Sequence, residues 1–167
     1  MIQTSLENLE QTSAPAGTYL VKNVNPGWFI YSAGFDIENA DMVVSFGSGL
    51  LEGWGTPIHM FQAHSRWKEN GGRLVQIEPR LSNTAAKADN WIAVNPGTEG
   101  ILALGMAHVI IKESLYHAGF INENTNGFEA WKKQVLDGYS PSNVSKITGV
   151  EETIMLKLAR DFAKAKR

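Results

Sequence analysis

The central part of the chain alternates short apolar runs with longer amphipathic stretches. Met42–Phe46 is short, apolar and rich in β-branched residues, which is typical of a strand that is buried on both faces, and Leu74–Ile77 is predicted to be the next strand. Between them, the stretch from Pro57 to about Glu69 has apolar residues at helical spacing, and Asn70-Gly71-Gly72 should end it. The pattern predicts a strand–helix–strand unit, and hence a parallel pair of strands joined by a right-handed crossover.

A third short strand is predicted at Trp91–Val94, and a long helix should follow it. Thr98 is expected to cap this helix, which should continue to about Ser114. Because the helix is apolar nearly all round, we expect it to pack against both the sheet and neighbouring helices. His108 lies on this helix and is interpreted as a satisfied core histidine rather than a metal ligand.

The two ends of the chain differ from this central pattern. From Gly119 onward the sequence is helical and more polar, and Thr148-Gly149-Val150-Glu151 has the spacing of a capping box that opens a last helix. Residues 1–33 instead combine a polar tail with short strand-like stretches. We therefore expect residues 34–167 to form a three-layer, Rossmann-like α/β domain. Its short, mainly parallel sheet should be flanked by helices, and its carboxyl-terminal part should be helical.

Composition excludes several classes of function. The chain has 167 residues, a net charge of −2 and no cysteine. It therefore lacks the charge of a nucleic-acid-binding protein, and it has no ligands for a cysteine-bound zinc ion or iron–sulfur cluster. We expect no direct insertion into a membrane, because the longest apolar stretch, residues 101–111, is too short to span one. The sequence as written opens with no signal peptide, and neither a catalytic constellation nor a metal-ligand set stands out.

A glycine-rich turn, Gly47–Gly55, lies between the first of these predicted strands and its helix. Glycines let a backbone approach a phosphate closely, and free amides at a helix start favour an anion, so Gly47, Ser48 and Gly49 are candidate contacts for a nucleotide. The alternative is a plain strand-to-helix turn. The close third glycine of a dinucleotide-binding fingerprint is missing, which argues against a small nicotinamide-binding domain.

Charged residues follow the next two predicted strands. Glu78 ends its strand and can accept hydrogen bonds from both hydroxyls of a ribose, while Pro79 offsets Arg80 rigidly for contact with a base or a phosphate. The alternative is a surface Glu–Arg ion pair. Glu99, at the start of the long helix, can accept from the N1 and N2 hydrogens of a guanine, or serve only as a favourable first-turn charge. Together these residues predict a nucleotide site at the carboxyl end of a parallel sheet.

Several motifs resemble, in order, those of the large catalytic subunit of the molybdopterin oxidoreductases, the dimethyl sulfoxide reductase family. They are Asp36–Asp41, Ile77–Arg80 with Ser82, Thr84-Ala85 and Ala88-Asp89, and Pro96–Glu99. The family's corresponding motifs read D-x-x-N-A-D, D-P-R-x-T-x-T-A-x-x-A-D and P-G-T-D. The resemblance covers residues 34–167. The sequences of Gly34–Ala40 and Leu51–Trp54 are most similar to those of the polysulfide, tetrathionate and quinone-reductase-like branch.

The resemblance implies a bis(molybdopterin guanine dinucleotide) cofactor that carries molybdenum or tungsten. By position, the implied contacts are Gly47, Ser48 and Gly49 along one dinucleotide, Glu78 at its ribose with Pro79, Arg80 and Ser82 nearby, and Gly97, Thr98 and Glu99 at its guanine end. Glu78 and Glu99 stand where the family more often has aspartate, so each carboxylate is displaced by one methylene. Many relatives have asparagine where Ser48 or Gly49 stands.

The same resemblance implies that the chain is a fragment of a longer catalytic subunit. The family's cysteine motif for an iron–sulfur cluster is absent, as is a cysteine ligand for the metal. We therefore expect the fragment alone neither to hold a complete cofactor nor to turn over. Its implied partners are the rest of the subunit and the iron–sulfur and membrane-anchor subunits of the parent complex, which in this branch is often periplasmic. The competing hypothesis is a stand-alone, Rossmann-like interaction or regulatory module without cofactor.

Overall fold

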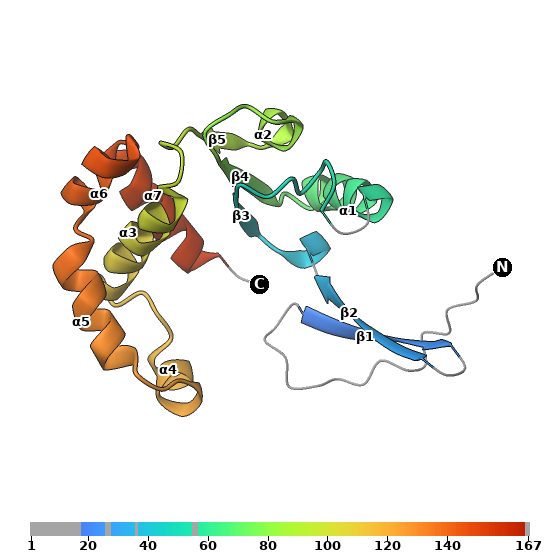
Figure 1. Cartoon of the computed structure of the whole chain (residues 1–167), viewed down its shortest axis with the longest axis horizontal. Coiled ribbons are helices and arrows are strands. Elements are labelled where there is room, and N and C mark those ends of the chain that lie inside the picture. Colours follow the sequence, from blue (N-terminus) through green and yellow to red (C-terminus); the bar gives the residue numbers. More distant parts are fainter. Residues whose placement is uncertain (1–17, 26–27, 36, 55–56, 166–167) are drawn as a thin grey trace.

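The computed structural model describes residues 18–25, 28–35, 37–54 and 57–165. β1 (Thr18–Asn25) and β2 (Trp28–Phe35) pair in antiparallel fashion, from Thr18 opposite Phe35 to Asn25 opposite Trp28. They form a two-stranded sheet of their own, so the strand-like stretches expected near the start of the chain are confirmed (Figure 1). The domain boundary at residue 34 stays a prediction.

The main sheet is parallel and has three strands in the order β3-β4-β5. These strands are β3 (Met42–Phe46), β4 (Arg73–Ile77) and β5 (Asn90–Ile92). A 3-10 turn, η2 (Ile37–Asn39), precedes β3, and α1 (Pro57–Glu69) lies between β3 and β4 in the chain. The predicted strand–helix–strand unit is therefore confirmed.

β5 ends earlier than the strand predicted at Trp91–Val94. The chain leaves the sheet because the Asn95 N–H donates to the Thr148 carbonyl (2.8 Å) and the Asn95 side chain donates to the Ile147 carbonyl (2.9 Å). Val94 packs in the core beside the helices instead of extending the ladder. These bonds join the segment after β5 to a helix more than fifty residues away, which strand propensity does not register.

α1 and η2 cover one face of the main sheet. Trp67 of α1 is almost fully buried there, and its indole N–H donates to the Ala40 carbonyl. The buried residues that pack together on this face are Ile37, Leu50, Leu51, Met60, Trp67 and Leu74. α1 therefore turns Met60 and Trp67 inward and leaves Phe61 exposed.

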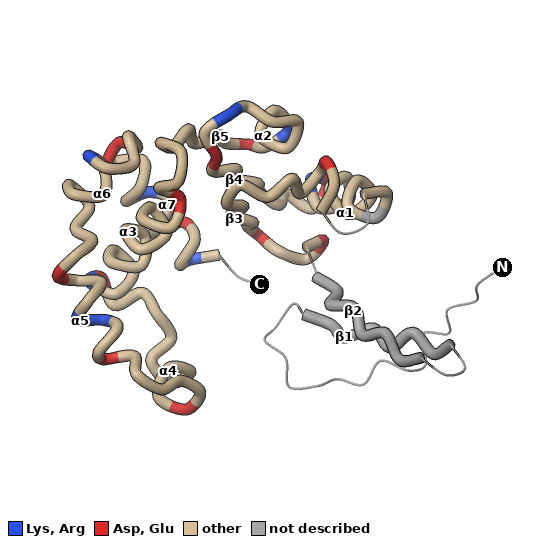
Figure 2. The backbone as a smooth tube through the Cα atoms, viewed as in Figure 1, with Lys and Arg blue, Asp and Glu red and all other residues tan. Residues whose placement is uncertain are grey.

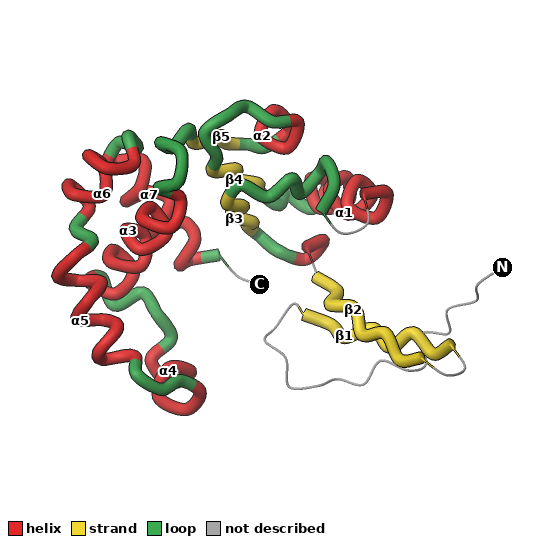
Figure 3. Tube along the Cα trace, in the orientation of Figure 1, coloured by secondary structure: helices red, strands yellow, loops and turns green. Residues whose placement is uncertain are grey.

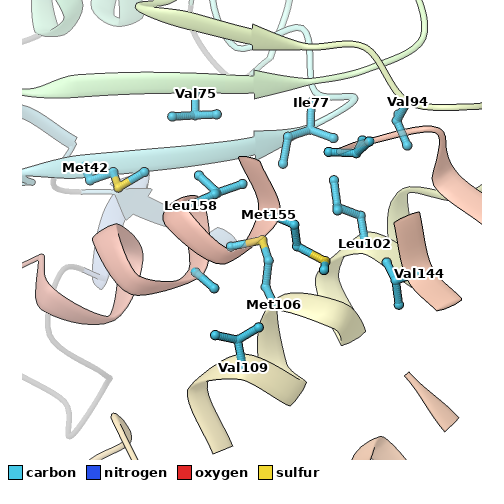
Figure 4. Packing of buried hydrophobic residues seen from close by; sticks show 12 residues of the cluster. Met42, Val75, Ile77, Val94, Leu102, Met106, Val109, Val144, Met155 and Leu158 are labelled. Carbon is cyan, nitrogen blue, oxygen red and sulfur yellow. The ribbon is translucent and has the colours of Figure 1, made fainter. Parts of the chain in front are cut away.

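Helices cover the opposite face and extend beyond it (Figure 3). They are α3 (Glu99–Lys112), α4 (Ala118–Asn124), α5 (Phe128–Gly138), α6 (Pro141–Thr148) and α7 (Glu152–Lys164). The larger core lies where α3, α6 and α7 meet the sheet, and Figure 4 shows Val75 and Ile77 on its sheet side and Met106 and Met155 on its helix side. The three-layer α/β fold predicted from the sequence is confirmed. None of the helices in the described ranges is both long enough and apolar enough to span a bilayer.

His108 of α3 is part of the helical layer. It is buried, and its Nδ1 lies 3.3 Å from the Val135 carbonyl oxygen of α5. One nitrogen of this buried imidazole therefore has a backbone partner, as buried polar groups usually do. The interpretation of His108 as a core histidine is therefore confirmed.

Thr98 is the N-cap residue of α3, as predicted, but its hydroxyl donates to the Asn95 carbonyl (2.7 Å) and makes no capping bond to the helix. The capping box predicted at Thr148–Glu151 is wrong. Thr148 is the last residue of α6, and its hydroxyl donates to the Val144 carbonyl (2.8 Å), so it does not open α7. α6 ends here because Gly149 adopts a left-handed conformation, with φ of 77°.

Gly105 of α3 lies against α6 and α7. A Cβ at this position would lie 2.7 Å from Met155 Sδ and 2.8 Å from Val144 Cγ1, so a side chain would force these residues apart. Gly105→Ala should lower the free energy of unfolding by about 1–3 kcal/mol, the usual effect of overpacking a core. Gly100→Ala, in the first turn of the same helix, meets nothing within 4 Å and should leave stability unchanged or raise it by about 0.5 kcal/mol. Equal stability of the two variants in urea denaturation would contradict this packing.

Candidate functional site

The turns after β3, β4 and β5 leave the main sheet at the same edge. The Gly47 N–H donates to the Ile77 carbonyl (2.9 Å) and the Glu78 N–H donates to the Ile92 carbonyl (3.3 Å), so pairing continues one residue beyond the ends of β3 and β4. The residues predicted for the site are distributed over these turns: Gly47, Ser48 and Gly49 after β3, Glu78, Pro79, Arg80 and Ser82 after β4, and Gly97, Thr98 and Glu99 after β5. The fold therefore brings the three groups to the carboxyl edge, with the β4 turn in the middle.

The turn after β3 leaves two of its backbone amides without an acceptor in the described part of the chain. Gly47 has φ of 61°, a left-handed conformation that favours glycine. The Gly49 carbonyl accepts from the N–H groups of residues 52–54 at 2.9–3.1 Å, which folds the turn back on itself. In the described part of the chain, no group accepts a hydrogen bond from the N–H of Ser48 or Gly49. Two consecutive amides are therefore available to an external acceptor.

The turn after β4 is organised around the Glu78 carboxylate. Glu78 is buried, and its Oε1 accepts hydrogen bonds from the Ser82 hydroxyl and from the Ser82 N–H (3.3 Å). The same hydroxyl accepts from the Ala85 N–H (3.1 Å), because Ser82 is the N-cap of the short helix α2 (Asn83–Lys87). Ser82 therefore positions Glu78 and caps α2, and one oxygen of Glu78 remains without a bond to a described residue.

Arg80 lies on the surface beside this carboxylate but does not pair with it. Its guanidinium makes no hydrogen bond or ion pair with any residue that the structure describes, so the surface Glu78–Arg80 pair weighed above is not formed. Pro79, between them, is exposed as well. Basic and acidic positions are interspersed along the described backbone rather than gathered in one broad patch (Figure 2). The Arg80 guanidinium is therefore available at the edge of the sheet.

The turn after β5 ends at the open amino end of α3. Gly97 is exposed with φ of 80°, whereas Thr98 and Glu99 are half-buried. Within the described ranges, the N–H groups of Gly97, Glu99 and Gly100 have no acceptor. Glu99 is the first residue of α3, so the interpretation as a first-turn charge and the interpretation as a guanine acceptor both fit its position.

Thr84 joins the β3 turn to the β4 turn, and sequence reasoning did not identify this role. Its side chain is fully buried, and its hydroxyl accepts from the Leu51 N–H (3.1 Å). In return, its own N–H donates to the Glu52 carboxylate (3.0 Å). The pKa of Glu52 is lowered, first by this backbone bond and also by the positive charge of Arg80. The two turns are therefore held as one unit.

Asp89 holds the start of β5 against β4. Its carboxylate accepts from the Leu74 N–H (2.8 Å) and from the Lys68 ammonium, and its own N–H donates to the Leu74 carbonyl (2.9 Å). Burial acts to raise the pKa of Asp89, but the bonds from Lys68 and Leu74 outweigh it and lower the pKa. The Ala88-Asp89 motif therefore serves the sheet rather than a ligand.

Two cavities lie away from the carboxyl edge. One of about 230 Å³ lies between the main sheet and α7 and is lined in part by Val75, Trp91 and Leu158. The other, of about 350 Å³, shares Arg73 and Asp161 with it, two residues that pair at 3.0 Å near the start of β4. Among the described residues, no cluster of three or more histidine, aspartate or glutamate side chains is arranged to hold a metal ion. The carboxyl edge is instead an exposed rim of turns, and its free amides are the stronger indication of a ligand.

The sequence and the fold were compared with those of known proteins. The sequence model of the molybdopterin oxidoreductase family matches residues 2–154. The menaquinone reductase, molybdopterin-binding-like subunit of Nitratidesulfovibrio vulgaris is 38% identical over 137 residues, which is 80% of this chain and 19% of that relative. Formate dehydrogenase H of Escherichia coli is 37% identical over 134 residues, 78% of this chain and 18% of that relative. The structure of acetylene hydratase from Pelobacter acetylenicus is similar with a TM-score of 0.69 and 30% identity, over 77% of this chain and 17% of that one.

This chain belongs to the molybdopterin oxidoreductase family. The ordered motifs between Asp36 and Glu99 therefore indicated the correct family. The chain spans less than a fifth of the length of each of these relatives. The activity of a whole protein of that length is accordingly a matter for proposal.

The bond between Glu52 and Thr84 gives the site a pH-dependent element. Glu52→Gln should lower the protection of the Thr84 amide against hydrogen exchange at neutral pH. The pKa of Glu52 is held below its ordinary value of 4.5. The contribution of the Glu52 carboxylate to Thr84 protection is therefore complete above pH 4.5 and is lost as the pH falls through the lowered pKa. The loss of protection should therefore shrink as the pH is lowered below 4.5 and disappear once Glu52 is protonated.

Glu113→Gln provides the matched control, because Glu113 pairs with Arg160 (2.7 Å) on the helical side of the molecule. It should leave Thr84 protection unchanged over the whole pH range. A difference between Glu52→Gln and the unmodified chain that does not shrink as the pH falls below 4.5 would show that the carboxylate charge is not the cause.

Proposed function

We propose that this chain is the domain of a molybdopterin oxidoreductase that holds the guanosine end of a molybdopterin guanine dinucleotide. The observation that carries the proposal is the set of free amides on both sides of Glu78, at Ser48 and Gly49 and at the start of α3. Successive backbone amides and open helix amino ends are the groups that bind phosphate oxygens in nucleotide sites. The whole protein, with molybdenum or tungsten on the pterin, is proposed to carry out two-electron redox chemistry.

The residues of the β3 and β4 turns fit a ribose and its phosphates. The N–H groups of Ser48 and Gly49 donate to phosphate oxygens, and the unpaired Arg80 guanidinium adds positive charge beside them. The oxygen of Glu78 that Ser82 leaves unbonded accepts from the ribose hydroxyls. Ser82 thus acts through Glu78, and Pro79 keeps Arg80 at the rim.

The β5 turn fits a guanine. The Glu99 carboxylate accepts from the N1 and N2 hydrogens of the base, while the backbone of Gly97 and Thr98 forms the turn that faces it. Adenine has no hydrogen on N1 and no amino group on C2, so this arrangement favours guanine. A carboxylate that is half-buried at a helix start is a strong acceptor because water competes with it less.

The proposed role of this chain is binding and orientation. The cofactor, when bound, supplies the redox centre, and the residues at the carboxyl edge fix the position of its nucleotide end. The first of the relatives reported above is named as a molybdopterin-binding-like subunit, which supports this class of role. The proposed partners are the remaining part of the catalytic subunit, a second dinucleotide, and iron–sulfur and membrane-anchor subunits of a larger complex.

Titration of the chain with GDP and ADP, followed by calorimetry, tests the proposal. GDP should bind more tightly than ADP, and Glu99→Gln should weaken GDP binding about tenfold, because hydrogen bonds to a charged group contribute about 1.5–3 kcal/mol. ADP binding should not change. Glu129→Gln removes the corresponding first-turn acid of α5 and should leave both affinities unchanged.

The outcomes of this titration separate the two hypotheses. Equal affinity for GDP and ADP in both the unmodified chain and Glu99→Gln would contradict guanine recognition. Absence of GDP binding at millimolar concentration would favour the stand-alone interaction or regulatory module.

A further inference from the structure

We infer that Gln76 is a positioning residue, whose buried side chain holds the Ser48 carbonyl and thereby aims the Gly49 N–H at a phosphate of the ligand. The inference rests on the proposed function, since it names the residue that sets the geometry of that phosphate contact. Gln76 belongs to β4, the central strand, and lies beneath the β3 turn.

The surroundings of Gln76 indicate that its side-chain amide does not serve to stabilise the fold. The side chain is fully buried, and the residues before and after it in β4 are the buried, apolar Val75 and Ile77. Its Nε2 donates to the Ser48 carbonyl at 3.1 Å, whereas its Oε1 is buried and has no hydrogen-bond partner among the described residues. A buried acceptor without a donor is unfavourable, and an apolar residue of similar size avoids that loss. The one bond that the amide makes is to the candidate site.

A second buried side chain points at the same carbonyl. The Ser45 hydroxyl lies 3.4 Å from the Ser48 oxygen, and Ser45 is directly opposite Gln76 in the parallel register of β3 and β4. The Leu50 N–H also donates to this oxygen, at 2.8 Å. The carbonyl is therefore held toward the sheet by two neighbouring strands.

The geometry of the peptide unit gives the direction of the Gly49 amide. In a trans peptide the carbonyl and the N–H that follows it point in opposite directions, and no cis peptide occurs in the described ranges. With the Ser48 carbonyl directed into the sheet, the Gly49 N–H is directed away from it. The Gly49 carbonyl is held as well, by the N–H groups of residues 52–54. Both peptide units beside Gly49 are therefore oriented before a ligand arrives, which lowers the entropy lost on binding.

The experiment compares the full chain with Gln76→Leu and Gln76→Met, which keep the side chain's size and remove its donor, and with Gln134→Leu, the same change on exposed α5. The first readout is the carbonyl ¹³C shift of Ser48 and the amide ¹⁵N shift of Gly49 in the ligand-free protein. The second is the affinity for GDP, and the third is the melting temperature. Having two variants at Gln76 keeps the test informative if one of them folds poorly.

We expect both Gln76 variants to move the Ser48 and Gly49 shifts and to weaken GDP binding about fivefold, the loss of one neutral hydrogen bond. The melting temperature should not fall, because the unpaired Oε1 disappears together with the bond. Gln134→Leu should change neither the shifts nor the affinity.

Three results would overturn the inference. Unchanged Ser48 and Gly49 shifts show that Gln76 does not hold the turn, whatever GDP does. Changed shifts and a lower melting temperature with unchanged GDP affinity show a structural role only, and leave the proposed function intact. Failure of the unmodified chain to bind GDP overturns the proposed function, and with it the role of Gln76 toward a phosphate.

Discussion

The parallel register of β3, β4 and β5 is the constraint on which the candidate site depends. The backbone bonds from Gly47 to Ile77 and from Glu78 to Ile92 bring the chain out of the sheet at one edge in two successive turns. The turn after β5 leaves at the same edge because its strand runs in the same direction. A shift of β4 by one residue against β3 would turn Gln76 to the other face of the sheet and remove its side chain from the Ser48 carbonyl.

Hydrogen bonds from polar side chains fix the inner side of the turns, and backbone N–H groups at the outer side of the turns remain free. Ser82 takes one oxygen of Glu78, and Thr84 joins the turn containing Leu51 and Glu52 to α2. The Gln76 side chain holds the Ser48 carbonyl, and the backbone N–H groups of residues 52–54 hold the Gly49 carbonyl. What remains at the rim is a set of N–H groups, the Arg80 guanidinium and two carboxylates, which are the groups that the proposed guanosine site would use. Binding, by this account, requires little rearrangement of the chain.

Local patterns were sufficient for the parts of the fold that local interactions determine. The strands at Met42–Phe46 and Leu74–Ile77, and the helix between them, follow from apolar spacing and from the glycines that end the helix. The length of β5 did not follow, because Asn95 is drawn away by a helix distant in sequence. The role of Thr84 was missed for the same reason, since its partners lie more than thirty residues away. Gln76 offered a signal, as a polar residue within the predicted strand Leu74–Ile77.

The most direct test of the central claim is to locate GDP on the isotopically labelled chain by intermolecular nuclear Overhauser effects. The account predicts contacts from the guanine and ribose protons to Gly97, Glu99 and the Glu78 turn, together with ligand-induced shifts of the Ser48 and Gly49 amides. Contacts instead to Trp91 and Leu158, which line the cavity between the sheet and α7, would contradict it.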